Sequence, residues 1–406
     1  MVNWFNKILI LIVCFLYVNT SNGADSTLAP VTAGDTTLKT TLIQNAINYC
    51  NKSGGGTIRL TGGIYRTGPI RILSNITLRI DSGATLLGSP IMSDWTIGTT
   101  QRNLLYTTGG PFVNVRITGK GTIDGSGAPW WAAYNADKTI SRPRLIYLSN
   151  ITNLTIDSLS VLNSPSFHIV PNTCRNVVID HITINTIKTS PNTDGIDPSQ
   201  CYNVLITNCS ISTGDDNIAI KAGGNVGLGG TQDITVTNCT FGAGHGLSIG
   251  SETFGGYNNL RVSGCTFKNT TNGIRIKSSI GNGGMVSNTY YSNITMTGVT
   301  NPIVVDWNYA AAVTTIPPKV PAGTNIYFNN LNITGSANAG IFNGVASSPI
   351  QNVVITNSNI SGKKVMTMNY VSGVTFKNVI VNNAVAKFGT NVTTATAGSV
   401  TGIQGF

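Results

Sequence analysis

Charge is scarce in this chain of 406 residues, of which only 10% are Asp, Glu, Lys or Arg. With 46 glycines and abundant Asn, Thr and Ile, the composition is poor for helices. It suits short strands joined by tight turns. We therefore expect an all-β protein, built either as two or three ordinary domains or as one elongated repeat domain.

Several binding motifs are also absent. No CxxC pair occurs, so a zinc site is not expected. The 25 basic residues outnumber the 15 acidic ones, but they are scattered, with no polybasic run and no interleaved aromatic stripe. This pattern argues against nucleic acid as a partner. The net charge of +10 favours acidic partners, such as an acidic polysaccharide. We also expect the protein to be a monomer.

Long apolar runs are absent beyond the N-terminus. There, a basic residue precedes the apolar run Ile8–Val18, and small residues suited to cleavage follow, up to Gly23. The run is too short to span a bilayer and is typical of a secretory signal peptide, with an uncleaved anchor as the alternative. We expect residues 1–23 to be removed and residues 24–406 to form one domain that is secreted, extracellular and not membrane-bound.

A repeat organises the mature chain. Segments that begin with a turn residue and then alternate apolar with polar side chains recur, as in NLTIDSLSV from Asn153 and NVVIDHITI from Asn176. Further copies begin at Asn203, Asp233, Asn259, Asn325, Asn352 and Gly373. Their starts lie roughly 21 to 30 residues apart, except for one gap with a degenerate copy near Asn288. Strand-only repeats of this period predict a right-handed parallel β-helix. A propeller, with about 40 to 45 residues in each blade, fits less well.

One helix is predicted, in the segment from Thr40 to Gly56. Its apolar residues Leu42, Ile43, Ala46, Ile47 and Cys50 fall on one face. Because a solenoid needs its open end covered, we expect this helix to cap the N-terminal end.

A second set of strands can be aligned by its apolar residues, Ile196, Ile218, Leu247 and Ile274. Neighbouring members are 22, 29 and 27 residues apart, one rung each, and successive rungs lie about 4.8 Å apart. This register stacks Asp194, Asp216, His245 and Asn272 in one column, with Asp215 beside them. Arg275 and Lys277 follow one rung beyond His245.

This constellation suits glycoside cleavage. Crowded carboxylates raise one another's pKa, which keeps one protonated as an acid. A pair about 6.5 to 9.5 Å apart leaves room for a water molecule, the inverting arrangement. Arg275 and Lys277 would bind negative groups of a substrate. For any single aspartate, a calcium site or an exposed ladder of turns is the alternative.

At these residues the chain resembles the polygalacturonases, the pectin-cleaving family of glycoside hydrolases. The resemblance rests on N-T-D at 192–194, G-D-D at 214–216, G-H-G at 244–246 and R-I-K at 275–277, with Tyr309 downstream. The segments GTIDGSGAPWW from Gly121 and NSPSFHI from Asn163 are similar to the bacterial-type branch. The resemblance covers nearly the whole mature chain. It implies a right-handed parallel β-helix that hydrolyses α-1,4-linked galacturonan with inversion, without a metal or other cofactor, and we expect endo action.

The resemblance also implies roles for individual residues. Asp215 resembles the general acid that protonates the leaving oxygen, and Asp194 and Asp216 resemble the pair that holds the attacking water. His245 resembles the residue that tunes the proton of the acid through a hydrogen bond. The implied substrate-binding residues are Asn192, Arg275, Lys277 and Tyr309. The chain departs from the family pattern at Asn217, where fungal members often have a cysteine, and at Trp307, where a glutamine is common.

Two other functions stay open. A β-helical polysaccharide lyase would cleave by β-elimination, usually with calcium and a basic residue as the base. A catalytically silent pectin-binding or adhesive β-helix would share the fold without turnover. Rhamnogalacturonan hydrolases also share the fold, but they generally lack the His and Arg-Lys pattern found here.

Six cysteines remain after the expected cleavage, which leaves 15 pairings open. Cys174 and Cys201 occupy the same repeat position on neighbouring rungs, so we expect a disulfide between them. The Cα separation of about 4.8 Å falls within the range that disulfides span. Cys209, Cys239 and Cys265 form a competing stack, which is equally compatible with a ladder of buried thiols.

Overall fold

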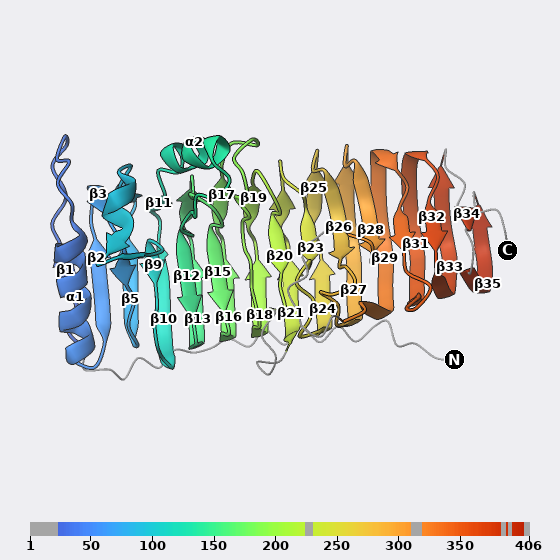
Figure 1. The fold of residues 1–406 in the computed structure, drawn as a ribbon, viewed down its shortest axis with the longest axis horizontal. Coiled ribbons are helices and arrows are strands. Elements are labelled where there is room, and N and C mark those ends of the chain that lie inside the picture. Colours follow the sequence, from blue (N-terminus) through green and yellow to red (C-terminus); the bar gives the residue numbers. More distant parts are fainter. Residues whose placement is uncertain (1–22, 224–229, 310–318, 383–386, 389–391, 402–406) are drawn as a thin grey trace.

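The protein is described by a computed structural model that covers residues 23–223, 230–309, 319–382, 387–388 and 392–401. Within these ranges the chain winds into a right-handed parallel β-helix (Figure 1), as the repeat predicted. Residues 1–22 of the predicted signal peptide lie outside the described residues. Neither helix in the described part of the chain has the length and apolar character needed to cross a membrane.

Each turn of the β-helix contributes strands to three parallel runs. The first run contains β1 (Ser26–Leu28), β2 (Gly56–Leu60), β5 (Ile76–Ile80), β10 (Phe112–Gly119), β13 (Ile151–Asp157), β16 (Arg175–Asp180), β18 (Tyr202–Thr207), β21 (Thr231–Thr237) and β24 (Tyr257–Ser263). The second run contains β3 (Gly63–Thr67), β6 (Ala84–Gly88), β11 (Thr122–Asp124), β14 (Ser160–Leu162), β17 (Thr183–Asn185), β19 (Ser210–Ser212), β22 (Thr240–Phe241) and β25 (Thr266–Lys268). Both runs merge in the long strands β27 (Met285–Thr297), β29 (Ala322–Asn338), β31 (Ile350–Lys364), β33 (Val371–Asn382) and β35 (Val392–Thr401).

The third run is interrupted. Its first part contains β4 (Ile70–Arg71), β9 (Leu105–Tyr106), β12 (Ile146–Ser149) and β15 (Ile169–Asn172). Its second part contains β20 (Ile218–Ile220), β23 (Leu247–Ile249), β26 (Asn272–Lys277), β28 (Asn301–Asp306), β30 (Ile341–Asn343), β32 (Thr367–Asn369) and β34 (Lys387–Phe388). A short 3-10 helix, η1 (Met92–Trp95), and the antiparallel pair β7 (Thr96–Ile97) and β8 (Thr100–Gln101) project from the coil.

The core consists of apolar side chains stacked from rung to rung. Parallel strands pair equivalent residues, as in the series Ile179, Ile206, Val236 and Val262, all of which are buried. Because side chains alternate across a strand, the residues between them face outward. The stacked apolar residues therefore extend the core along the axis without requiring any single rung to enclose it.

The turn residues that begin the repeats form a second stack. Asn153, Asn176 and Asn203 have φ of 65°, 54° and 56°, a left-handed conformation that asparagine tolerates. The side-chain amide of each donates to the side-chain oxygen of the asparagine one rung earlier, at 3.0 Å from Asn176 to Asn153 and 2.9 Å from Asn203 to Asn176. This ladder explains why asparagine recurs at the start of the repeats.

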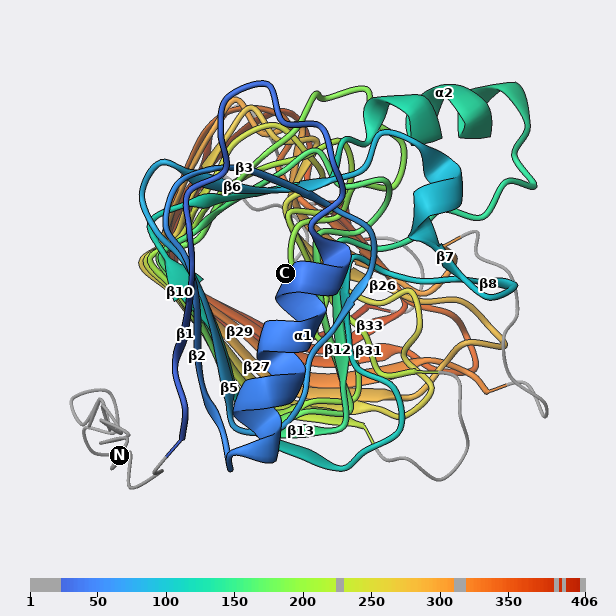
Figure 2. The same ribbon diagram turned by 90° about the vertical axis from the view of Figure 1, so that its left-hand side faces the viewer.

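The predicted capping helix is confirmed as α1 (Thr40–Lys52), which lies across the N-terminal end of the coil (Figure 2). Its buried residues are Ile43, Ala46, Ile47 and Cys50. Leu42 was assigned to the same face, but it is 49% exposed because the buried stripe is narrower than predicted. A second helix, α2 (Ala128–Ala136), was not predicted, and its residues Trp130 and Trp131 are both buried.

The cysteine stacks are confirmed, but the predicted disulfide is not formed in the structure. Arg175 and Tyr202 are register partners, so Cys174 and Cys201 occupy equivalent positions on adjacent rungs. Both thiols are free and buried, and each contacts a backbone oxygen 3.4 Å away. Cys174 and Cys201 thus occupy equivalent positions without forming a disulfide, because each thiol points to a backbone carbonyl group of the preceding rung. The other four described cysteines are also free and buried.

Candidate active site

The register confirms the predicted column. Ile196 bridges to Ile218, which pairs with Leu247, which pairs with Ile274. The residues two positions earlier are Asp194, Asp216, His245 and Asn272. The rung of Asp194 lies where the third run is interrupted, since isolated bridges connect it to β15 and β20 in place of a regular strand.

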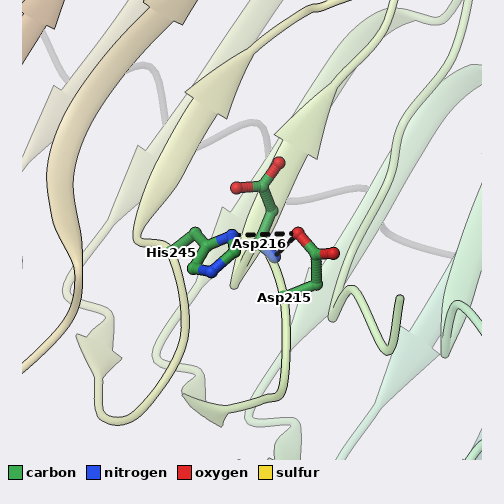
Figure 3. Close-up of side chains that lie close together, drawn as sticks. All are labelled: Asp215, Asp216 and His245. Atoms are coloured by element: carbon green, nitrogen blue, oxygen red, sulfur yellow. Dashed lines mark hydrogen bonds and ion pairs between the residues drawn. The ribbon is translucent and has the colours of Figure 1, made fainter. Parts of the chain in front are cut away.

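Asp215 and His245 face one another from adjacent rungs (Figure 3), with His245 Nδ1 3.1 Å from Asp215 Oδ1. The His245 backbone N–H also donates to the Asp215 carbonyl oxygen at 2.9 Å. Glycines flank the histidine because the turn is tight: Gly244 has φ 128° and Gly246 has φ 74°. A Cβ at Gly246 would lie 2.2 Å from the carbonyl oxygen of Asn272. The G-H-G motif therefore sets the position of the imidazole.

Asn217 links the turn that carries Asp215 to the turn that carries His245 by hydrogen bonds. Its buried side-chain amide donates to the carbonyl oxygens of Ile211, at 3.0 Å, and Ala243, at 2.8 Å. Its side-chain oxygen accepts from the Gly246 N–H at 2.8 Å. The turns of Asp215 and His245 are thus held together by hydrogen bonds of a single buried side chain.

Asp216 is directed away from the Asp215–His245 pair (Figure 3) and is almost fully buried. Its Oδ1 accepts from Arg275 Nη2 and from Ser248 Oγ, the latter at 2.9 Å. Its Oδ2 lies 2.8 Å from Lys277 Nζ. Two cations compensate one buried carboxylate, which leaves this part of the site with net positive charge.

The remaining substrate-binding residues adjoin these groups. The Tyr309 ring centroid lies 5.2 Å from Lys277 Nζ and 5.9 Å from Arg275 Cζ, within cation–π range. Asn192 lies on the other side, where its amide donates to Asp215 Oδ2 at 3.4 Å and its side-chain oxygen accepts from Arg142 at 2.7 Å. The structure therefore brings together all eight residues predicted for the site, while their roles stay predictions.

The pKa values of the aspartates do not follow the expectation that crowding keeps the general acid, Asp215, protonated. Burial raises the pKa of Asp215, but the hydrogen bond and charge of His245, with the charge of Lys277, outweigh it and leave the pKa lowered. Asp194 instead has a pKa well above its usual range, because of burial and the nearby charge of Asp197. Burial also raises the pKa of Asp197 to about 7.

Asp197 and Lys221 belong to the site but were not predicted as site residues. Lys221 Nζ lies 3.5 Å from Asp197, 3.9 Å from Asp194 and 3.7 Å from Glu252. Both carboxylate oxygens of Asp197 and one of Asp194 are buried without a hydrogen-bond partner in the structure. The register offered a signal for both, since Asp197 directly follows Ile196 and Lys221 comes three residues after Ile218, next to the aligned column. No sequence signal indicated Arg142, which reaches Asn192 from 50 residues away.

The donor set fits a metal poorly. One ligand atom each from Asp215, Asp216 and His245 lies within 4.8 Å of the others. However, Arg275 and Lys277 already occupy the oxygens of Asp216, and a divalent cation beside them would meet two like charges. Hard cations also favour a shell of several oxygens that are not already paired with cations, whereas both oxygens of Asp216 accept from a cationic side chain.

Comparison with known proteins identifies the family. The model of the glycosyl hydrolases family 28 matches residues 57–379. The chain belongs to this family. An endo-polygalacturonase of Pectobacterium carotovorum subsp. carotovorum is 37% identical over 303 residues, which cover 69% of this chain and 74% of that protein. The predicted family and the predicted glycoside hydrolase class are thus confirmed.

Solved structures agree with the fold. The polygalacturonase of Erwinia carotovora ssp. carotovora has a TM-score of 0.74 at 30% identity and covers 92% of this chain and 97% of its own. A family 28 exopolygalacturonase of Yersinia enterocolitica has a TM-score of 0.79 at 22% identity, covering 94% of this chain and 78% of its own, a likeness that shows the fold alone.

Proposed function

We propose that this family 28 glycosyl hydrolase is an endo-acting polygalacturonase, which hydrolyses α-1,4-linked galacturonan with inversion. The observation that carries the proposal is the grouping of three aspartates on adjacent rungs with Arg275 and Lys277 beside them. Carboxylates supply the acid and base that glycoside hydrolysis needs. The two cations suit a substrate that carries a carboxylate on every sugar.

Asp215 is the proposed general acid. Its side chain is 24% exposed, whereas those of Asp194 and Asp216 are 5% and 1% exposed, so it is the most accessible of the three to a glycosidic oxygen. The lowered pKa of Asp215 makes it a strong donor once protonated. A bound galacturonate carboxylate would offset the charge of Lys277 and raise the pKa of Asp215, which favours the protonated form that the general acid needs.

Asp194 and Asp216 are proposed to hold the attacking water. The raised pKa of Asp194 makes its ionised form a stronger base than an ordinary aspartate. Asp216 is held rigidly by Arg275, Lys277 and Ser248, so it can orient a water without moving. We propose that Arg275 and Lys277, with Asn192 and Tyr309, bind the galacturonate carboxylate next to the cleaved bond.

The remaining assignments follow from this substrate. Galacturonan outside the cell requires a secreted enzyme, so we propose that residues 1–23 are a cleaved signal peptide and 24–406 the catalytic domain. The net charge of +10 favours association with an acidic polysaccharide. Because the basic residues are scattered, without a polybasic run, we propose that neither nucleic acid nor a membrane is a partner. We propose that the enzyme acts as a monomer without a metal or other cofactor.

A product profile on polygalacturonic acid, with and without chelator, tests the proposal. We expect new reducing ends, no unsaturated ultraviolet-absorbing product, activity that survives the chelator, and products of inverted anomeric configuration by NMR. A rapid fall in viscosity relative to the release of reducing ends would indicate endo action. Unsaturated products would indicate a lyase, and binding without any cleavage would indicate a silent pectin-binding protein.

A further inference from the structure

Basic and aromatic side chains extend the catalytic column on the side away from Arg275 and Lys277. Ile146, Ile169 and Ile196 are register partners on three successive rungs, and the residues two positions before them are Arg144, Phe167 and Asp194. Arg144 therefore occupies the same rung position as Asp194, two rungs towards the N-terminal end, at about 10 Å.

The contacts between Arg144 and the catalytic carboxylates are continuous. Arg144 Cζ lies 5.1 Å from the centroid of the Tyr147 ring and 5.4 Å from that of Phe167. Lys221 Nζ lies 4.8 Å from the same Phe167 ring, and it also contacts Asp194. Phe167 thus separates the two cations and holds each in place by its ring.

Arg144 has no acidic partner in the described part of the chain. Other arginines of the chain do, since Arg116 Nε lies 2.9 Å from Asp157 and Arg79 Nε lies 2.8 Å from Asp81. Among the described residues, no carboxylate pairs with Arg144, and its buried Nε has no hydrogen-bond partner. A desolvated guanidinium donor without an acceptor is costly. A planar carboxylate is the acceptor that best matches its paired donors.

We propose that Arg144 determines binding of a second galacturonate, by pairing with the carboxylate of a unit on the opposite side of the cleaved bond from Arg275 and Lys277. This inference rests on the proposed function. Because Arg144 lies two rungs from Asp194, short oligomers placed at the aspartates do not reach it. Phe167 positions Arg144 and keeps Lys221 directed to Asp194 and Asp197.

The length dependence of turnover tests this subsite. We would measure kcat/KM on galacturonate oligomers from dimer to hexamer for wild type, Arg144→Gln, Arg144→Lys and the control Arg175→Gln. Arg175 also lies near a ring, that of Tyr202 at 5.5 Å, but it is the first residue of β16 in the first run and does not belong to the catalytic column. We expect Arg144→Gln to lower kcat/KM about tenfold on the longest oligomers by raising KM. The value of kcat/KM on the shortest cleaved substrate should stay unchanged.

Arg144→Lys should keep part of the affinity, and Arg175→Gln should match wild type at every length. An equal loss at all lengths, or no loss at the longest, would overturn the proposal. If Arg144→Gln does not fold, Arg144→Lys tests the subsite, because lysine keeps the charge but lacks the paired donors of the guanidinium. A KM of Arg144→Lys for long oligomers equal to that of wild type would then contradict the subsite.

A binding measurement separates this inference from the proposed function. Hexamer binding would be followed by calorimetry in an Asp215→Asn background, with and without Arg144→Gln. Weaker binding in the double variant supports the subsite even if the wild-type chain cleaves nothing. Cleavage by wild type with an unchanged Kd in the double variant would leave the function standing and remove the subsite.

Discussion

The side-chain oxygen of Asn217 accepts a 2.8 Å hydrogen bond from the Gly246 N–H, which ties the turn of Asp215 to the turn of His245. We expect Asn217→Ala to destabilise the protein by about 2 kcal/mol or more, because buried backbone groups of Ala243 and Gly246 lose their partner. Urea unfolding would measure the loss, with Asn258→Ala as the control, since Asn258 is an exposed asparagine on β24. Equal stability of both variants would contradict this role.

The exchange Asp215→Asn should abolish nearly all hydrolysis while the fold stays intact. General acid–base groups commonly contribute about 10²- to 10⁴-fold in rate. Turnover of polygalacturonic acid gives kcat, and circular dichroism with thermal unfolding controls for folding. A folded variant that keeps more than about a tenth of wild-type kcat would mean that another group is the acid.

Arg275→Ala and Lys277→Ala should mainly weaken the use of de-esterified pectin. Both side chains lie at Asp216 on the outward phase of β26, where a galacturonate carboxylate could replace or share their contacts. The relevant comparison is kcat/KM on pectins of low and high methyl ester content. If both substrates lose equally, the cations do not recognise the carboxylate.

The buried Asp197 should make stability depend on pH. Its pKa of about 7 lies above the unfolded value of about 3.9, so the folded protein binds the proton more tightly. Its contribution to stability is complete below pH 4 and is lost as the pH rises through 7. The charged groups that influence it are Asp194, Lys221, Asp216 and Glu252. We expect Asp197→Asn to lose less stability than wild type between pH 4 and pH 7. Thermal unfolding of both proteins across this range measures the loss, and equal changes in their unfolding temperatures would contradict this role.

The six described cysteines should behave as buried thiols. We expect Ellman's reagent to label none of them in the native mature protein and all six after unfolding, because each is almost inaccessible to solvent. A reducing agent should then leave the unfolding temperature unchanged. Non-reducing peptide mapping is the direct check, and a peptide linked through Cys174 and Cys201 would show that the bridge forms after all.

Much of the fold was predictable because it is periodic. The starts at Asn153, Asn176 and Asn203 were identified from a turn residue followed by alternation, and the structure shows the left-handed turns that asparagine permits there. The catalytic column was predictable for the same reason, since equal positions in successive repeats must stack. What failed was not periodic: α2 has no amphipathic spacing, and Arg142 reaches Asn192 through a loop that sequence spacing cannot place.

Electrostatics could not be predicted from residue types. The alignment indicated that the carboxylates were crowded, but not which would be buried and which would face a cation. Asp215 has a histidine partner and a lowered pKa, whereas Asp194 lies against a second buried aspartate and has a raised one. The difference arises from side-chain contacts across rungs that are 22 to 29 residues apart in sequence.

The unequal spacing of the rungs has a consequence for how this cleft can vary. The intervals from Ile196 to Ile218, Leu247 and Ile274 differ, yet the parallel hydrogen bonds hold the four residues in one line. Extra residues accumulate in the connections between strands and leave the ladder itself unchanged. Insertions in those connections can therefore raise or lower the walls around a bound chain, and so alter which polymers enter, without moving one catalytic group relative to another.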